Sequence, residues 1–346
     1  MTHPASSAPF PLAPSPSGSQ LTSWILERRG PKSRVNPDKV NAWTVESEPC
    51  AGPDPLQQAS IWTLFLTNKE CPWRCLMCDL WKHTLDHRTP DGAVGRQIDA
   101  AFAEIRSSGY SEVEERWLKL YNSGSFLDPQ AIPSTDLPEI LKRSSGFDRL
   151  ILECHPALVS ASLQMFLGQF TRSFENSEPP RLEIAMGLET AHPATLARLN
   201  KRMTTADFAR AADLLRANNV DLRVFLLVHP PFLSRDEAIS ALHESIRFAF
   251  DCGARVVSLI PSRMGNGAME ELHKAGLFQE PSLADLEDAS DLGLSMRRGF
   301  VFADLWDLVR FSRCGRCFDS RYQRLHEMNL SQQPRPRVNC PDCGGR

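Results

Sequence analysis

The stretch Cys71-Pro72-Trp73-Arg74-Cys75-Leu76-Met77-Cys78 carries three cysteines, separated by three and then by two residues. It follows the run Ile61-Trp62-Thr63-Leu64-Phe65-Leu66, which has the length and composition of a buried strand. This arrangement is typical of a loop that wraps thiolates around one face of an iron–sulfur cluster. A 4Fe-4S cluster normally takes four thiolates, so three cysteines leave one iron open to another ligand.

Apolar runs of strand length recur after that first run, at 116–121, 149–152, 182–188, 222–228 and 254–260. Segments with helical spacing of apolar residues lie between them. About six repeats of strand and helix predict right-handed crossovers and a parallel sheet that helices cover. Because six units are fewer than the eight of a closed barrel, the sequence favours an α/β fold with an incomplete (β/α)6 TIM-like barrel.

Polar residues follow the predicted strands, where folds of this kind bind their ligands. The cysteine loop follows the first strand and Asn122-Ser123-Gly124 follows the second. The third, fourth and fifth strands lead into Glu153, Glu189 and His229. Because the carboxyl ends of parallel strands meet at one edge, we expect these residues to lie near the cysteine loop.

The cysteine spacing behind a first strand, with a partial barrel after it, resembles the radical S-adenosylmethionine superfamily over residues 58 to 265. Within it the chain is similar to the branch that contains the elongator catalytic subunit, and in particular to the radical enzymes of archaeosine biosynthesis, which act on a modified 7-deazaguanine base in transfer RNA. The stretches that carry this similarity are Glu70-Cys71-Pro72-Trp73-Arg74-Cys75-Leu76-Met77-Cys78-Asp79-Leu80-Trp81, Asn122-Ser123-Gly124-Ser125-Phe126-Leu127-Asp128, Gly187-Leu188-Glu189-Thr190 and Pro230-Pro231-Phe232-Leu233.

The resemblance implies that Cys71, Cys75 and Cys78 hold three irons of a 4Fe-4S cluster and that S-adenosylmethionine chelates the fourth. One electron through the cluster would then release a 5′-deoxyadenosyl radical. Asn122-Ser123-Gly124 occupies the position of the family's Gly-Gly-Glu stretch, which contacts the methionine amino group, but it lacks the second glycine and the acid.

Glu153 and Glu189 are the expected catalytic and cofactor-binding acids, and His229 is a further candidate for a cofactor contact. Each assignment has an alternative. The three cysteines would also suit a structural zinc loop with a distant fourth ligand. The two acids would also suit buried ion pairs, and His155 and His229, each before a proline, would suit hydrogen-bonded turn residues.

Two Cys-x2-Cys pairs lie near the end of the sequence, Cys314 with Cys317 and Cys340 with Cys343. Four thiolates in this pattern predict a zinc-ribbon-like unit, with an auxiliary iron–sulfur cluster as the alternative. Clustering of seven of the ten cysteines favours metal binding over disulfides. Cys50, Cys154 and Cys252 have no local partner, and we expect them to pack as small hydrophobic residues.

The expected organisation is a disordered Pro/Ser-rich tail over 1–20, an extension over 21–57, the partial barrel over 58–300 and a metal-binding unit with four cysteines over 301–346. Residues 310–346 hold eight arginines against three acids, and residues 27–39 hold five cations against two acids. Such basic ends are compatible with phosphate contacts, and solvated surface charge is the alternative. No apolar run reaches membrane length and no secretory signal is present, which predicts a cytoplasmic protein.

These observations favour a radical enzyme that modifies a base in transfer RNA or a related 7-deazaguanine substrate. One alternative is radical chemistry on a small molecule, and another is a non-catalytic, zinc-dependent nucleic-acid-binding protein. The resemblance further implies an external one-electron donor, carbon–nitrogen bond cleavage, and a separate upstream enzyme that first modifies the base.

Overall fold

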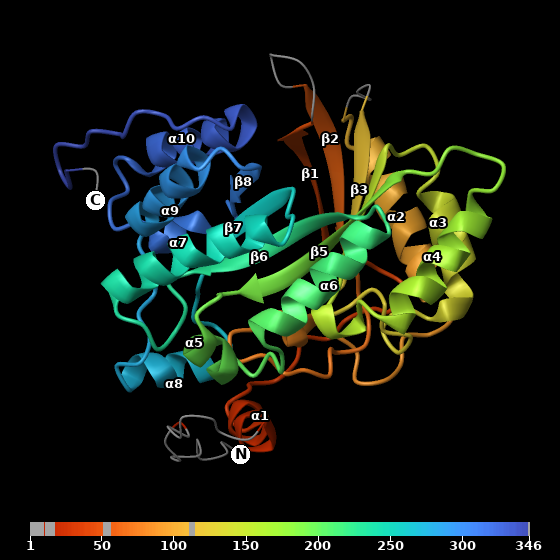
Figure 1. The fold of residues 1–346 in the computed structure, drawn as a ribbon, viewed down its shortest axis with the longest axis horizontal. Coiled ribbons are helices and arrows are strands. Elements are labelled where there is room, and N and C mark those ends of the chain that lie inside the picture. Colours follow the sequence, from red (N-terminus) through yellow and green to blue (C-terminus); the bar gives the residue numbers. More distant parts are fainter. Residues whose placement is uncertain (1–9, 11–17, 51–56, 111–114, 345–346) are drawn as a thin grey trace.

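The computed structural model describes residues 10, 18–50, 57–110 and 115–344 (Figure 1). Their strands are β1 (Ala42–Pro49), β2 (Gln58–Phe65), β3 (Arg116–Tyr121), β4 (Arg149–Glu153), β5 (Arg181–Glu189), β6 (Asp221–Val228), β7 (Val256–Pro261) and β8 (Phe300–Ala303). The α-helices are α1 (Gly18–Leu26), α2 (Ala93–Ser107), α3 (Leu137–Arg143), α4 (Ala161–Ser173), α5 (Pro193–Arg198), α6 (Thr205–Ala217), α7 (Arg235–Asp251), α8 (Ala268–Lys274), α9 (Leu283–Ser295) and α10 (Phe318–Ser331). Four short 3-10 helices complete the set in the described residues: η1 (Leu80–His83), η2 (Ser134–Asp136), η3 (Pro156–Leu158) and η4 (Leu308–Phe311).

The eight strands form one sheet in the order of the sequence, with β2 to β8 parallel and β1 antiparallel to β2. The sheet curls with helices on its outer side (Figure 1), which confirms the predicted incomplete barrel. The six predicted strands are β2 to β7. Sequence reasoning missed β8 because it has only four residues, and missed β1 because Glu46 and Glu48 interrupt its apolar pattern.

The outer helices follow from local signals in the sequence. In α7, Ser234 accepts a hydrogen bond from the backbone of Glu237, whose side chain accepts one from Ser234 in return. This capping box starts the helix. Leu242 and Ile246, four residues apart, are buried in the main core between the helices and the sheet. The apolar residues at helical spacing therefore lie on the face of α7 that packs on the strands, as expected.

Charged side chains fill part of the barrel's inner face. Glu183 on β5, which has no exposed surface, binds Arg223 at 2.7 Å and Arg149 at 3.0 Å. Arg223 also binds Glu48 of β1 at 2.7 Å, and Lys119 of β3 binds the same carboxylate. Arg223 and Lys119 outweigh the effect of burial on Glu48 and lower its pKa to about 2. These ions compensate one another inside the barrel, where an unpaired charge would be costly.

Helix α10 lies against both edge strands, β1 and β8, and covers the seam between them. Its Asn329 side chain bonds both the backbone N–H and the carbonyl of Ala303, at 2.9 Å each. Gln332, just after the helix, does the same for Val301, at 2.8 and 3.1 Å. These side-chain amides occupy the positions that a further strand would take, so the edge of β8 is not left unpaired.

The amino-terminal extension packs onto the barrel through α1. Most of the tail predicted to be disordered, 1–9 and 11–17, lies outside the described residues. Phe10 is buried, with its ring 5.1 Å from that of Trp24, and α1 begins at Gly18. Within the described part of the chain, no helix is both long and apolar enough to cross a bilayer.

Candidate functional site

The three-cysteine loop follows β2, and all three thiols are free and partly buried. Arg74 lies within it at a φ of 56°, and the Cys78 amide donates to the Cys75 carbonyl at 3.2 Å. The Leu76 amide donates to the carbonyl of Leu199, which follows α5, at 2.9 Å. The loop is therefore folded by its own backbone and attached to a distant segment.

The residues after β3 lie directly against this loop. A methyl group placed at Gly124 would come 3.1 Å from the Cβ of Cys71, so glycine permits the close approach. Ser123 has a φ of 50°, and Asn122 is completely buried. Neither polar atom of the Asn122 side chain has a partner among the described residues. Buried amides are normally bonded, so this one suits a polar ligand.

Glu153 ends β4, and its side chain accepts a hydrogen bond from the backbone N–H of Asn122 at 3.0 Å. Burial raises the pKa of Glu153 to about 7, against an ordinary value of 4.5, and this hydrogen bond opposes the rise. The carboxyl group is thus poised to change its protonation near neutral pH. Such a perturbed acid in a cluster of polar groups is typical of a functional site.

Glu189 ends β5 at a φ of 68°, and its Oε1 lies 2.7 Å from the Nζ of Lys201. Gly187 leaves room for this pair, because a Cβ at that position would meet the Glu189 carboxylate and the Lys201 ammonium group, and both would have to move. Burial acts to lower the pKa of Lys201, but the charges of Glu189 and Cys75 outweigh it, so the pKa is raised and the ammonium form is favoured. Lys201 in turn opposes the rise that burial imposes on the pKa of Cys75.

Lys201 was missed by sequence reasoning. Its one signal was the run Asn200-Lys201-Arg202 after an apolar helix, which resembles many surface turns. Only the fold brings its ammonium group to Glu189 and near enough to Cys71 and Cys75 to affect their pKa values. Glu189 is therefore in a buried ion pair, as the alternative interpretation of this acid held, and the same pair lies beside the cysteine loop.

The two histidines after the strands differ in their surroundings. His155 stacks on Trp73 with ring centroids 3.8 Å apart and caps η3, and burial lowers its pKa to about 3. It is the hydrogen-bonded turn residue that the sequence suggested. His229, at a φ of 59°, bonds the carbonyl of Gln279 through Nδ1 at 2.7 Å. Its buried Nε2 has no partner among the described residues.

The residues present fit a polar cofactor at this edge of the sheet. The unpartnered groups of Asn122, His229 and Ser262 follow β3, β6 and β7, so they share the edge at which the cysteine loop lies. Glu153 binds Asn122 and affects the pKa of Cys71, and Glu189 affects that of Cys75. His229 instead belongs to a contact with the segment before α9. Buried donors and acceptors left open in this way are complementary to a ligand with several polar groups.

The four carboxyl-terminal cysteines come together as expected. Their sulfur atoms lie within 4.8 Å of one another, with Cys314 3.9 Å from Cys340 and Cys317 3.6 Å from Cys343. Zinc–sulfur bonds of about 2.3 Å in a tetrahedron place sulfurs about 3.8 Å apart, which matches. Backbone N–H groups of Asp342 and Cys343 lower the pKa of Cys340 to about 7. Helix α10 occupies the interval between the two pairs.

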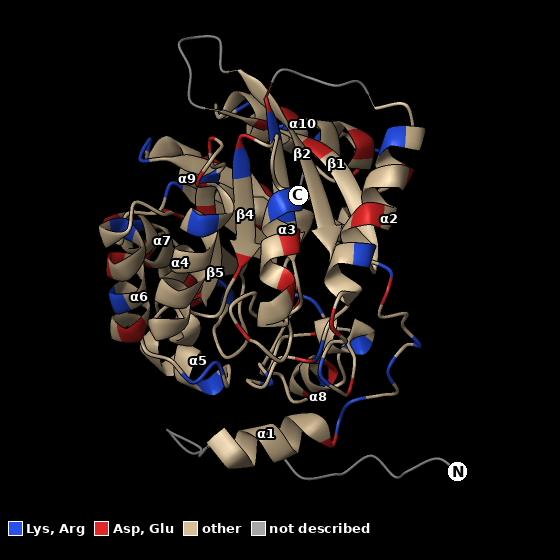
Figure 2. Cartoon of the chain, turned by 90° about the vertical axis from the view of Figure 1, so that its right-hand side faces the viewer, with Lys and Arg blue, Asp and Glu red and all other residues tan. Residues whose placement is uncertain are grey.

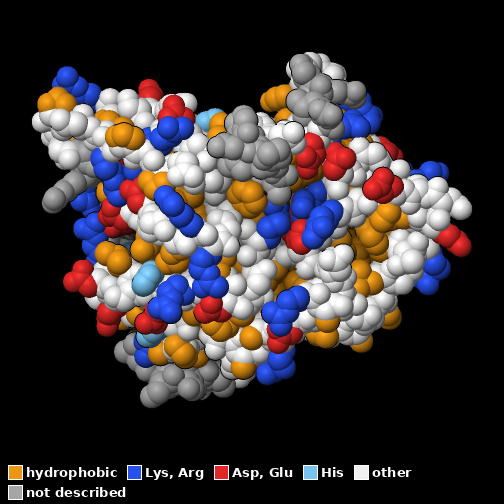
Figure 3. All heavy atoms as spheres, turned by 45° about the horizontal axis from the view of Figure 1, so that its top comes forward, with side chains coloured by type: hydrophobic (Ala, Val, Ile, Leu, Met, Phe, Trp, Pro, Cys, Tyr) orange, Lys and Arg blue, Asp and Glu red, His pale blue; other side chains and the backbone are white. Residues whose placement is uncertain are grey.

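Most of the carboxyl-terminal arginines bind acids of the same chain. Ion pairs join these arginines to residues of α9 and to loops: Arg310 to Glu280, Arg316 to Asp342, Arg321 to Glu287, Arg324 to Asp291, and Arg337 to Asp288. Basic and acidic side chains are interspersed on the face drawn in Figure 3. Figure 2 shows basic residues along the segment after α1, where Arg29 and Lys32 bind Glu70. The charge count alone therefore does not indicate phosphate contacts.

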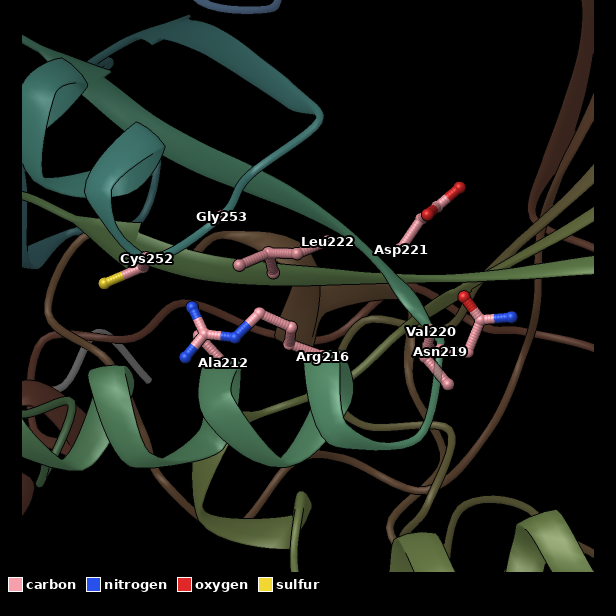
Figure 4. Close-up of a pocket in the computed structure, with 8 residues that line it drawn as sticks. All are labelled: Ala212, Arg216, Asn219, Val220, Asp221, Leu222, Cys252 and Gly253. Atoms are coloured by element: carbon pink, nitrogen blue, oxygen red, sulfur yellow. The ribbon is translucent and has the colours of Figure 1, made fainter.

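One surface pocket lies away from this site. Figure 4 shows it between α6 and the start of β6, lined by residues that include Arg216, Asp221 and Cys252. Asp221 is the first residue of β6, so the pocket is at the amino-terminal end of the strand, opposite the edge where parallel sheets bind ligands.

Comparison with known proteins gives curated relatives and solved structures with a similar fold. No family model matches the chain. It is 29% identical to archaeosine synthase subunit beta of Thermococcus kodakarensis, over 37% of this chain and 39% of that protein. It is 30% identical to archaeosine synthase subunit beta of Methanosarcina acetivorans, over 49% of this chain and 48% of that protein. The chain thus spans about half or less of the length of these relatives.

An archaeal Elp3 from Methanocaldococcus infernus, solved with residues 1–46 deleted, shares the fold. The TM-score is 0.50 at 14% sequence identity, over 70% of this chain and 59% of that one. The resemblance that the sequence indicated is therefore confirmed in the relatives and in the fold.

Proposed function

We propose that this chain, which resembles the elongator-like branch of radical S-adenosylmethionine enzymes, holds a 4Fe-4S cluster on Cys71, Cys75 and Cys78. The observation that carries the proposal is the position of the loop with its three free thiols after β2, directly against Gly124, where Lys201 is near enough to affect the pKa values of Cys71 and Cys75. A bound cluster supplies the electron that cleaves S-adenosylmethionine into methionine and a 5′-deoxyadenosyl radical. The protein supplies placement and exclusion of water.

The chain's own residues have distinct tasks in this proposal. Asn122 and Glu153 bind the amino group of S-adenosylmethionine, since one offers an unpaired amide and the other a carboxyl group that ionises readily beside a cation. Glu189 and Lys201 form a fixed pair that places a positive charge near the thiolates. Ser123 and Gly124 contribute backbone at close range, and His229 contributes its free Nε2.

The proposed substrate is a modified 7-deazaguanine base in transfer RNA, on which radical chemistry cleaves a carbon–nitrogen bond. Support comes from the names of the curated relatives. An external one-electron donor and an upstream base-modifying enzyme are the partners this requires. A small-molecule substrate is the alternative within radical chemistry, and a non-catalytic nucleic-acid-binding protein is the alternative outside it.

For the carboxyl-terminal site we propose zinc. The sulfur separations fit one tetrahedral ion, and the two Cys-x2-Cys pairs are typical of structural zinc. An iron–sulfur cluster at Cys314, Cys317, Cys340 and Cys343 is the alternative. Metal analysis separates the two. A zinc site predicts one zinc ion per chain together with about four irons, which then belong to the three-cysteine loop.

The test is anaerobic reconstitution with iron and sulfide, followed by reduction in the presence of S-adenosylmethionine. We expect 5′-deoxyadenosine, detected by mass spectrometry, from the wild type and from Cys252→Ala, which removes a buried thiol remote from the site. We expect none from Cys71→Ala. A wild-type protein that binds iron but yields no 5′-deoxyadenosine, with or without transfer RNA, would refute the radical function. Nucleoside analysis of the RNA distinguishes the RNA substrate from a small molecule.

A further inference from the structure

We propose that Asn200 and Asn266 are positioning residues that hold the three-cysteine loop in its cluster-binding shape. Neither residue carries a ligand atom, and each binds carbonyl groups of the loop from a different side. The inference rests on the proposed function, because it concerns the same cluster, and it assigns that site's geometry to residues outside the cysteine motif.

Asn266 follows β7 and has 4% of its surface exposed. Its Nδ2 donates to the Leu76 carbonyl at 2.7 Å and to the Cys78 carbonyl at 3.2 Å. Its Oδ1 accepts from the Met269 amide at 2.9 Å, in the first turn of α8. The side chain therefore connects the second half of the loop to the first turn of α8, and both its amide nitrogen and its oxygen are engaged.

Asn200 follows α5 and is 2% exposed, at a φ of 53° that asparagine adopts more readily than most residues. Its Nδ2 donates to the Arg74 carbonyl at 2.9 Å and to the Trp73 carbonyl at 3.2 Å. The same group lies 3.1 Å from the Thr22 hydroxyl of α1. This second asparagine binds the first half of the loop, so the two side chains hold it between them.

An apolar anchor completes the arrangement. Leu76, between the second and third cysteines, has no exposed surface and packs in a small core with Leu21 of α1, Leu199, and Met269 of α8. The amino-terminal extension also reaches the start of the loop, where Arg29 and Lys32 bind Glu70 at 2.5 and 2.9 Å. The extension, whose role the sequence did not reveal, thus forms part of the loop's support.

These contacts orient the loop without touching the sulfur atoms. Four carbonyls of the loop accept hydrogen bonds from two side-chain amides; three lie between the cysteines and the fourth directly follows Cys78, so the bonds set the direction of those peptide planes. Fixed peptide planes fix the directions of the Cα–Cβ bonds that carry the thiols. Ligands held in this way before a metal centre binds lose less conformational freedom on binding, so the complex is tighter.

The experiment compares Asn266→Asp, Asn200→Asp and the wild type. The matched control is Asn218→Asp, a half-buried residue at the carboxyl-terminal end of α6 whose Nδ2 also donates to a backbone carbonyl, that of Leu214. Aspartate has nearly the shape of asparagine, but it replaces the Nδ2 group that donates to the loop carbonyls with an oxygen that accepts hydrogen bonds. We expect the two variants, once reconstituted, to transfer iron to a chelator about tenfold faster than the wild type. We also expect an altered electron paramagnetic resonance signal of the reduced cluster, while the control behaves like the wild type.

A readout on the metal-free protein keeps the proposal independent of activity. Hydrogen exchange at the Leu76 amide, which donates to the Leu199 carbonyl, should accelerate in both variants while exchange in α7 is unchanged. Iron transfer and exchange at wild-type rates in both variants would overturn the inference. A wild type that takes up no iron would instead overturn the proposed function, and the inference with it.

Discussion

Replacing Glu153 by glutamine should remove a penalty on stability that grows as pH rises. Burial raises the pKa of Glu153 in the folded protein to about 7, whereas its ordinary value is 4.5. Below the lower value the carboxyl group is protonated in both states. As pH rises, the unfolded chain ionises first, so stability falls until pH exceeds the folded value, and the full penalty is about 3 kcal/mol. Glutamine does not ionise, and its side-chain oxygen can still accept the hydrogen bond from the backbone N–H of Asn122.

The assay is urea unfolding of the metal-free protein at about pH 5 and at about pH 8.5, with circular dichroism as the signal. The stability of Glu153→Gln relative to the wild type should rise by about 2.5 kcal/mol between these conditions. Comparing the two pH values cancels any constant cost of fitting the amide group. Glu175→Gln, an exposed position on the surface, is the control and should show little change. A relative stability of Glu153→Gln that does not change with pH would refute the assignment of a buried, protonated acid at the cofactor edge.

Three further predictions follow from other parts of the structure. Cys314→Ser should lose the carboxyl-terminal metal and accelerate hydrogen exchange at the Val301 amide, which donates to the Gln332 side chain at the end of α10. An unchanged exchange rate would mean that the metal does not support the helix over the seam. Lys201→Met should lower the free energy of unfolding by about 3–5 kcal/mol, because it leaves Glu189 buried without its partner. Adding Glu189→Gln should restore much of that loss, and chemical denaturation measures both effects. A Lys201→Met variant as stable as the wild type would contradict a buried pair. Glu183→Gln should also lower the free energy of unfolding by about 3–5 kcal/mol, because three arginines lose their shared carboxylate. A stability near that of the wild type would show that solvent screens the charges on the barrel's inner face.

The partial barrel was predictable because its signals are local. Apolar runs of β2 to β7 alternate with helical segments, and that alternation leads to a parallel sheet whatever the details of packing. The charges inside the barrel were not predictable, since Lys119 and Arg223 within apolar strands have no local partner in sequence. Glu48, their shared acid, lies on β1, 71 and 175 residues away from them.

For the site, the sequence by itself determined which residue types are available and where they follow strands: three thiols at fixed spacing, Glu153 and Glu189, and two cysteine pairs. The tertiary structure alone decided that Lys201 pairs with Glu189 near enough to the cysteine loop to affect the pKa of Cys75. It also decided that Asn200 and Asn266 bind carbonyls of that loop, across separations of 127 and 190 residues. The physical reason is that parallel strands deliver loops from the whole chain to one edge. Hydrogen bonds between those loops depend on distances that no short stretch of sequence contains.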